Sequence, residues 1–182
     1  MKRSRKASFI FLNSELIEYL AKPYTSIMTH LKQGDKAPDF SCNDENGILR
    51  SLQEYYGKKL IIYFYPKDNT PGCTIQSCNL RDNYEDLKRA GFEIVGVSAD
   101  GEKKHQNFIS KYKLPFTLLA DSEKVMLNAY GVWGPKKFMG REYDGIHRIT
   151  FAIDEQGIIS HIIDKVKTKD HTGQIKALYG IE

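Results

Sequence analysis

Two of the three cysteines in this 182-residue chain lie five positions apart, as Cys73 and Cys78 in the segment "YPKDNTPGCTIQSC". A disulfide staple, a pair of metal ligands, ordinary packing and redox chemistry are all compatible with such a pair. A closed zinc site is disfavoured, because it requires a second Cys or His pair at metal-ligand spacing. Three cysteines form no disulfide framework and fit a reducing compartment, in which a close pair is more often catalytic or metal-binding than structural.

Cys73 stands where a helix is expected to begin, because Pro71 and Gly72 form an entry turn before it. The first turn of a helix presents unpaired backbone N–H groups and a partial positive charge, and both stabilise a thiolate. Thr70 can direct its hydroxyl toward the same place, and Asp68 is the only acidic residue close to it in the sequence. These features predict a cysteine that readily ionises.

Buried strands alternate with amphipathic helices around the cysteine segment. Continuous apolar runs predict the strands, and apolar residues at helical spacing predict the helices. In chain order we expect a strand at 58–66, a helix at 75–90, a strand at 92–100, a helix at 101–113 and a strand at 116–121. Such strand–helix–strand units are parallel and right-handed.

The remaining segments add antiparallel pairs and two further helices. They read as two short extended pieces within 37–52, a helix at 123–131 capped by Asp121 or Ser122, a loop at 132–145, a hairpin of strands 147–154 and 157–164, and a C-terminal helix at 170–180. The whole order predicts an α/β domain with a thioredoxin-like fold, in which helices cover both faces of a mixed central β-sheet. The cysteine segment then follows the carboxyl end of a central strand.

Composition describes one globular domain with an N-terminal extension. Hydrophobic residues make up 41% of the chain and charged residues 27%, which is ordinary for a soluble protein. Residues 1–27 hold five basic and two acidic side chains, so they supply +3 of the net charge of +4. We expect a poorly ordered or partly helical extension at 1–27 and a domain at 28–182. No basic surface for nucleic acid, signal peptide or membrane span is visible, which predicts a cytoplasmic protein.

The segment "PKDNTPGC" has the pattern Pro-x-x-x-Thr-x-x-Cys, and here the chain resembles the peroxiredoxins. Cys78 and the later stretch "GVWGPKKFMGREYDGIHRITFAID" narrow the resemblance to the peroxiredoxin Q group, also called bacterioferritin comigratory protein. The resemblance covers roughly residues 30–182. It implies a thiol-dependent peroxidase that reduces hydrogen peroxide and organic hydroperoxides.

The resemblance also implies roles for five residues. Cys73 would be the peroxidatic thiolate, Thr70 would hydrogen-bond the peroxide, and Pro66 would shield the pocket from water. Arg148 would stabilise the thiolate and the charge that develops on the leaving oxygen. Cys78 would be the resolving thiol, forming an intramolecular disulfide that thioredoxin or a similar dithiol reduces. No cofactor or metal is implied, and a monomer is the simpler expectation.

Helix geometry constrains that disulfide. Residues five apart in an intact α-helix have Cα atoms about 8–9 Å apart, whereas a disulfide requires less than about 7 Å. We therefore expect residues 72–80 to unfold locally on oxidation. Gln76 departs from the glutamate that is common three positions after the first cysteine in this group, which keeps the hydrogen-bonding reach but removes the charge.

The other distinctive residues receive structural interpretations. Cys42 is expected to pack, His105 to lie on an exposed helical face and His161 to lie in a strand, while strand alternation points His147 away from Arg148. Two rival functions remain: a disulfide reductase or isomerase, which usually carries C-x-x-C, and a redox-regulated binding protein. Peroxide turnover with a thioredoxin reductant separates the three.

Overall fold

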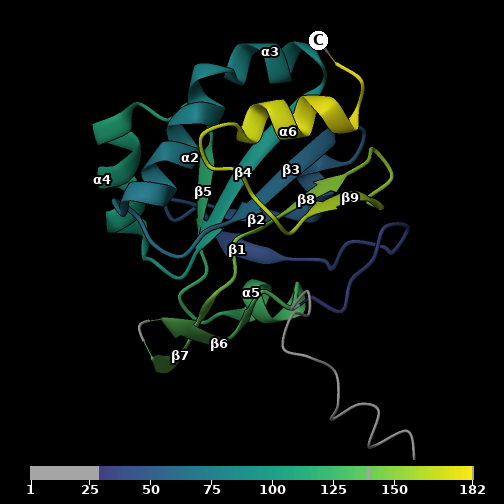
Figure 1. The fold of residues 1–182 in the computed structure, drawn as a ribbon. Coiled ribbons are helices and arrows are strands. Elements are labelled where there is room, and N and C mark those ends of the chain that lie inside the picture. Colours follow the sequence, from purple (N-terminus) through teal and green to yellow (C-terminus); the bar gives the residue numbers. More distant parts are fainter. Residues whose placement is uncertain (1–28, 139, 182) are drawn as a thin grey trace, which may run out of the picture.

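A five-stranded mixed β-sheet lies at the centre of the fold (Figure 1). The computed structural model describes residues 29–138 and 140–181. The sheet has the order β5-β4-β3-β8-β9 and is formed by β3 (Lys59–Phe64), β4 (Phe92–Ser98), β5 (Thr117–Ala120), β8 (Ile149–Ile153) and β9 (Ile159–Ile163). Strands β3, β4 and β5 are parallel, and β8 and β9 join them in antiparallel pairing.

Helices and two small ribbons surround this sheet. The helices are η1 (Leu52–Tyr55), α2 (Pro71–Asp82), α3 (Tyr84–Arg89), α4 (Glu102–Tyr112), α5 (Val125–Ala129) and α6 (His171–Leu178). The ribbons are antiparallel pairs of β1 (Ser41–Asn43) with β2 (Leu49–Ser51) and of β6 (Trp133–Phe138) with β7 (Arg141–Ile146).

Side chains of β3 alternate between two hydrophobic cores, because successive strand residues point to opposite faces. Leu60, Ile62 and Phe64 join the core covered by α5, η1 and the β1–β2 ribbon. Ile61 and Tyr63 join the core covered by α2, α3, α4 and α6, the helices at the top and left of Figure 1. The prediction of a mixed central sheet with helices on both faces is therefore confirmed.

Two local predictions were wrong. The stretch 132–145, expected to be a loop, forms the β6–β7 hairpin, whose turn includes Gly140 at a φ of 78°. The helix expected at 75–90 is broken at Asn83, whose side-chain amide donates to the carbonyl of Asn79 at 2.8 Å. Asparagine competes for backbone groups in this way, which is why it often ends helices.

The described chain begins beside α5, where the hydroxyl of Thr29 donates to the carbonyl of Tyr130 at 2.7 Å. The extension predicted at 1–27 lies outside the described residues, so its helix or disorder stays a prediction. Among the helices that the structure describes, none has the length and apolar character needed to cross a membrane.

Candidate active site

Strand β3 leads directly into the cysteine segment. Thr70 is the residue before α2 and has an extended backbone (φ −87°, ψ 149°), and Pro71 occupies the first turn. Proline is favoured there because the N–H that it lacks would have no partner within the helix. Cys73 follows in the same turn and is buried, with 1% of its surface exposed. The cysteine thus lies at the carboxyl end of a central strand and the start of a helix, where the unpaired N–H groups of the turn favour a thiolate.

Arg148 reaches the cysteine from the neighbouring strand. It immediately precedes β8, and Ile149 pairs with Phe64 at the end of β3. Its Nη2 donates to Cys73 Sγ at 3.2 Å, and its Nη1 donates to the side-chain oxygen of Gln76. One guanidinium therefore contacts both the thiol and the next turn of α2, and its positive charge has the sign that would favour a thiolate in that position.

Gln76 is completely buried on α2. Its oxygen accepts from Arg148, while its Nε2 is a buried donor for which the described residues supply no acceptor. A glutamine in this place orients Arg148 without adding a negative charge beside Cys73. The positive charge of Arg148 is consequently not offset by this contact.

Thr70 and Pro66 lie in the loop between β3 and α2, and both are half-buried. The Thr70 hydroxyl donates to the carbonyl of Lys67 at 2.9 Å. Its hydrogen is used within the loop, so its oxygen is left to accept a hydrogen bond from an incoming group. The roles predicted for these two residues stay predictions.

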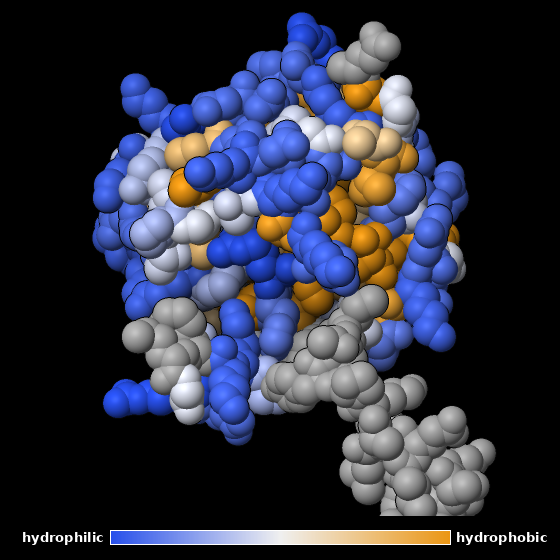
Figure 2. Space-filling model, in the orientation of Figure 1, coloured by the Kyte–Doolittle hydropathy of each residue, from blue (hydrophilic) through white to orange (hydrophobic). Residues whose placement is uncertain are grey.

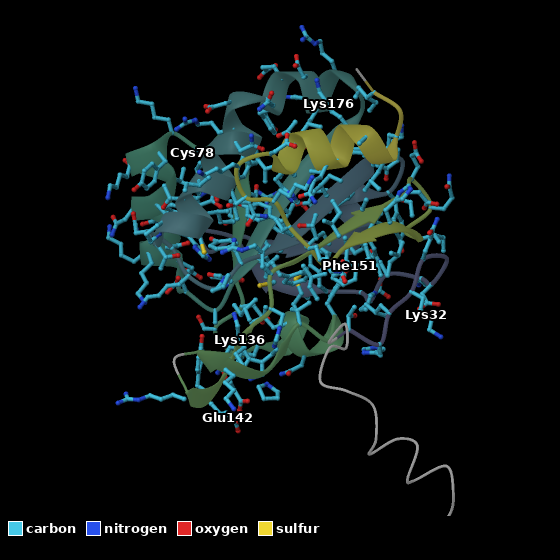
Figure 3. All side chains as sticks on the ribbon, in the orientation of Figure 1. Lys32, Cys78, Lys136, Glu142, Phe151 and Lys176 are labelled. Atoms are coloured by element: carbon cyan, nitrogen blue, oxygen red, sulfur yellow. The ribbon has the colours of Figure 1, made fainter. Side chains whose placement is uncertain are left out.

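Cys78 lies farther along α2 (Figure 3) and is a free, partly exposed thiol, as Cys73 is a free, buried one. Its neighbours hold this part of the helix in place. The hydroxyl groups of Ser77 and Tyr63 are hydrogen-bonded at 3.1 Å, and Asn79 contacts the segment at the start of α6 through bonds of 2.8 and 3.1 Å. The helix is intact between the two cysteines, so joining them requires a rearrangement.

A second cation near the site was missed by the sequence reasoning. Lys136 on β6 (Figure 3) donates from Nζ to the carbonyl of Ile146 at 3.0 Å. Its pKa is lowered, chiefly by burial and further by Arg148, while Cys73 acts in the opposite direction. The lysine was overlooked because its segment was interpreted as a loop, in which no residue has a predictable direction.

The prediction that His105 lies on an exposed helical face was wrong, because its side chain is completely buried. Its Nδ1 lies 2.8 Å from a carboxylate oxygen of Asp68, and its Nε2 lies 3.1 Å from the carbonyl of Leu119. With Phe108 three residues later, it forms the inner face of α4. A polar ring is tolerated there because both nitrogens have partners.

Cys42 and His161 agree with their structural interpretations. Cys42 is the middle residue of β1 and is buried in the core, and burial raises its pKa to about 12. His161 lies in β9 with its ring against Tyr179. His147 is half-buried next to Arg148 and contacts the carbonyl of Pro135 at 3.2 Å through Nε2.

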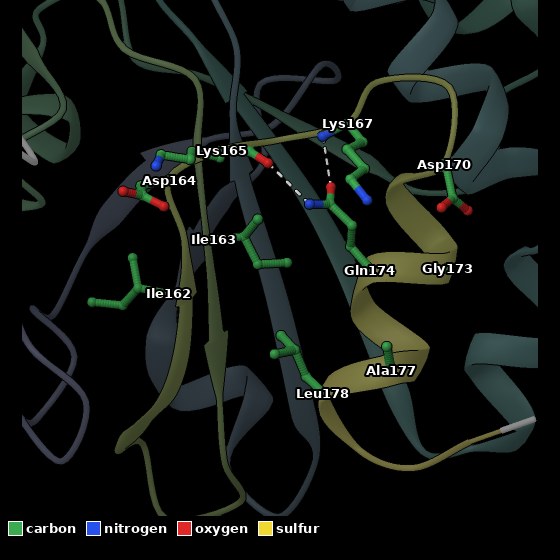
Figure 4. A pocket seen from close by; sticks show the side chains of 10 residues that line it. All are labelled: Ile162, Ile163, Asp164, Lys165, Lys167, Asp170, Gly173, Gln174, Ala177 and Leu178. Atoms are coloured by element: carbon green, nitrogen blue, oxygen red, sulfur yellow. Dashed lines mark hydrogen bonds between the residues drawn. The ribbon is translucent and has the colours of Figure 1, made fainter.

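A cavity of about 390 Å³ lies between β9 and α6, away from the cysteines (Figure 4). In Figure 2 hydrophobic surface gathers over the same part of the molecule, and Ile162, Ile163 and Leu178 belong to the lining. Gln174 closes one side by donating to the carbonyl of Lys165 at 2.9 Å and accepting from the N–H of Lys167 at 2.6 Å. Both the oxygen and the NH₂ of its side-chain amide are therefore already hydrogen-bonded to the backbone of the loop before α6. Within 29–138 and 140–181, no group of three or more residues is arranged to hold a metal ion.

Comparisons with known proteins show the family of the chain. Residues 33–162 match the model of the AhpC/TSA family. Peroxiredoxin Bcp of Escherichia coli is 49% identical over 144 residues, which are 79% of this chain and 92% of the relative. Peroxiredoxin Bcp of Bacillus subtilis is 45% identical over 141 residues, covering 78% and 90%.

Solved structures give the same result for the fold. A structure of Xanthomonas campestris Peroxiredoxin Q superimposes with a TM-score of 0.75 at 32% identity, covering 85% of this chain and 98% of that one. Peroxidoxin BcpB of Mycobacterium tuberculosis superimposes with a TM-score of 0.73 at 28% identity, covering 84% and 99%. The thioredoxin-like class predicted from the order of elements is confirmed. The chain belongs to the AhpC/TSA family, in its Bcp and peroxiredoxin Q group.

Proposed function

We propose that the chain is a thiol-dependent peroxidase that reduces hydrogen peroxide and organic hydroperoxides with Cys73 as its peroxidatic residue. Membership of the peroxiredoxins supports a peroxidase, an oxidoreductase, in general terms. The observation that carries the specific proposal is the 3.2 Å contact from Arg148 Nη2 to Cys73 Sγ in the first turn of α2. A guanidinium and a helix N-terminus act together on one buried sulfur.

In the first step the Cys73 thiolate attacks the outer oxygen of the hydroperoxide. A sulfur–oxygen bond forms and the O–O bond breaks, so the sulfur is oxidised to a sulfenic acid and the peroxide is reduced. The leaving alkoxide or hydroxide takes a proton and departs as an alcohol or water. Arg148 stabilises both the thiolate and the charge on the leaving oxygen. The free lone pairs of Thr70 would accept from the hydroperoxide O–H, and Pro66 would limit access of water.

In the second step Cys78 attacks the sulfur of the sulfenic acid. A disulfide forms, the S–O bond breaks, and the oxygen leaves as water after taking the thiol proton. Residues 72–80 unwind to let the two sulfurs meet. A dithiol such as thioredoxin then reduces the disulfide by exchange and is itself oxidised.

Since both cysteines belong to one chain, a monomer can complete this cycle. We place the protein in the cytoplasm, where dithiol reductants keep thiols reduced.

The test is to add one equivalent of hydrogen peroxide to fully reduced protein and to measure intact mass and free thiols. Wild type is expected to lose two thiols as an internal disulfide between Cys73 and Cys78. Cys78→Ser stops at the sulfenic acid, and Cys73→Ser hardly reacts. Cys42→Ser is the matched control and behaves as wild type, because Cys42 is buried in the other core. A Cys73 that reacts no faster than an ordinary thiol refutes the proposal and favours disulfide exchange or regulated binding.

A further inference from the structure

A buried hydrogen-bonded cluster holds the loop between β3 and α2, and the mechanism above does not use it. At its centre is Asp68, of which 6% of the surface is exposed. One carboxylate oxygen accepts from the hydroxyl of Tyr65 at 2.7 Å, and the other lies 2.8 Å from Nδ1 of His105. Tyr65 and His105 are both completely buried. Each carboxylate oxygen of Asp68 thus has a hydrogen-bond partner inside the protein.

The bonding of His105 fixes how many protons the cluster holds. Its Nε2 lies 3.1 Å from the carbonyl of Leu119, and a carbonyl only accepts, so Nε2 carries a hydrogen. A close Nδ1–carboxylate contact then needs one further proton between His105 and Asp68. The pair is either imidazolium with carboxylate or neutral imidazole with carboxylic acid, and in both forms its net charge is zero.

The backbone of Asp68 is anchored as well. Its N–H donates to a carboxylate oxygen of Asp100 at 2.7 Å. Asp100 is in turn held by Lys104 Nζ at 2.8 Å, and its own N–H donates to the hydroxyl of Ser98 at 3.1 Å. The loop is therefore fixed to the end of β4, to α4 and to β5, the three elements on that side of β3.

The cluster holds the loop that leads into α2, the helix that carries Cys73. Asp68 lies midway between Pro66 and Thr70, the two loop residues assigned to the peroxide pocket. Between Asp68 and Thr70 the chain passes through Asn69 at a φ of 58°, a left-handed conformation that a non-glycine residue adopts when its surroundings impose it. The direction of the Thr70 hydroxyl therefore depends on where Asp68 is held.

We propose that Asp68 and His105 are positioning residues for the peroxidase reaction: they hold the loop that carries Pro66 and Thr70, and His105 prevents the buried carboxylate from adding an unpaired negative charge to the loop that leads to Cys73. This inference rests on the proposed function. In this inference His105 acts by holding the loop in place. It has no role in proton transfer, because it does not contact the substrate.

Three variants separate the parts of the proposal. Asp68→Ala removes the anchor. Asp68→Asn keeps it, because the amide oxygen accepts from Tyr65 and the amide NH₂ donates to a neutral His105. His105→Ala leaves the carboxylate of Asp68 buried without its partner. Asp154→Ala is the matched control: this carboxylate also accepts two bonds, from the N–H groups of Gln156 and Ile158 at 3.0 and 2.8 Å, but in the β8–β9 turn at the other end of the sheet.

Two rates are measured at pH 7 on each protein, after unfolding curves confirm that it is folded. The first is the reaction of Cys73 with hydrogen peroxide, which needs the loop. The second is its alkylation by iodoacetamide, which needs a thiolate but no peroxide pocket. Asp68→Ala is expected to slow the peroxide reaction by about 30-fold, as small displacements of positioning groups do, and alkylation by less than about threefold. His105→Ala slows both reactions, and adding Asp68→Asn to it restores alkylation.

Asp68→Asn is expected to keep the peroxide rate within about threefold of wild type, and Asp154→Ala to leave both rates unchanged. A peroxide rate in Asp68→Ala and His105→Ala within about threefold of wild type overturns the inference while the proposed function stands. Equal losses in both rates for Asp68→Ala overturn it as well, since they indicate general disruption. A wild type that is no faster with peroxide than an ordinary thiol overturns the proposed function, and the inference with it.

Discussion

Replacing Arg148 with methionine removes a charge while keeping a long side chain at the same place. In the native protein Nη2 donates to Cys73 Sγ at 3.2 Å. Arg148 is only half-buried, so water screens the interaction in part. We expect Arg148→Met to reduce the thiolate fraction of Cys73 and to slow its reaction with peroxide.

The size of the loss follows from this distance. Two unit charges 3.2 Å apart interact by about 5 kcal/mol at an effective dielectric constant of about 20. A hydrogen bond to a charged group contributes about 1.5–3 kcal/mol in measured series. Because water screens a half-buried site, we expect Arg148→Met to lose about 2–4 kcal/mol of stabilisation, which lies between the lower measured value and the Coulomb value. This loss corresponds to a peroxide reaction that is roughly 30- to 900-fold slower.

The assay is stopped-flow measurement of the second-order rate constant of reduced protein with hydrogen peroxide at pH 7. Arg141→Met is the control, because Arg141 is an exposed arginine of β7 in the same region of the chain. It is expected to react as wild type. If Arg148→Met loses less than about fivefold while remaining folded, the 3.2 Å contact does not activate the thiol, and the electrostatic reasoning is refuted.

Three further predictions concern the redox cycle, the glutamine and acid stability. Residues 72–80 are expected to lose amide protection in the oxidised protein while β4 keeps it, and hydrogen exchange with equal protection in both states would contradict this. Gln76→Glu places a carboxylate beside Arg148 and is expected to slow alkylation of Cys73 about three- to tenfold at pH 7; a faster reaction would show that orienting Arg148 matters more than charge. Burial lowers the pKa of His171 from 6.5 to about 4, so the unfolded chain binds the proton more readily and the free energy of unfolding falls as pH drops through this window, by roughly 3 kcal/mol. Urea unfolding at a series of pH values should show this slope in wild type and little of it in His171→Gln, and parallel slopes would disprove it.

The central strands β3 and β4 were predictable because they are apolar runs. Strands that are buried on both faces carry few polar residues, so their position is visible without any knowledge of their partners. The strands β3, β4, β8 and β9 all fall within the ranges expected for them. The β6–β7 hairpin was missed because Pro135 and three glycines within 132–145 resemble a loop, and the pairing that overrides them is a property of two segments together.

The site was predictable only in part. Local sequence places Cys73 at a helix start, but its contact with Arg148 joins residues 75 positions apart and follows from the register of β3 with β8. Arg148 was predicted from the resemblance to the peroxiredoxins, because its distance along the sequence from Cys73 gives no indication of the contact. His105 was misplaced for the same reason. Its partner Asp68 is 37 positions away, and a polar residue on a helix looks exposed until the partner is known.

Arg148 and Cys73, the two partners of the thiol contact, belong to parts of the fold that differ in how far they can move. Arg148 adjoins β8, which is paired on both edges within the sheet, whereas Cys73 belongs to α2, the helix that opens in the proposed cycle. In the proposed cycle, disulfide formation therefore gives up the helix packing, including the contacts of Ser77 and Asn79, and reduction recovers it. Helix refolding thus becomes part of the driving force for reduction. Each kcal/mol of that packing raises the reduction potential of the disulfide by about 20 mV, so substitutions on α2 that never touch sulfur should tune how easily the enzyme is recycled.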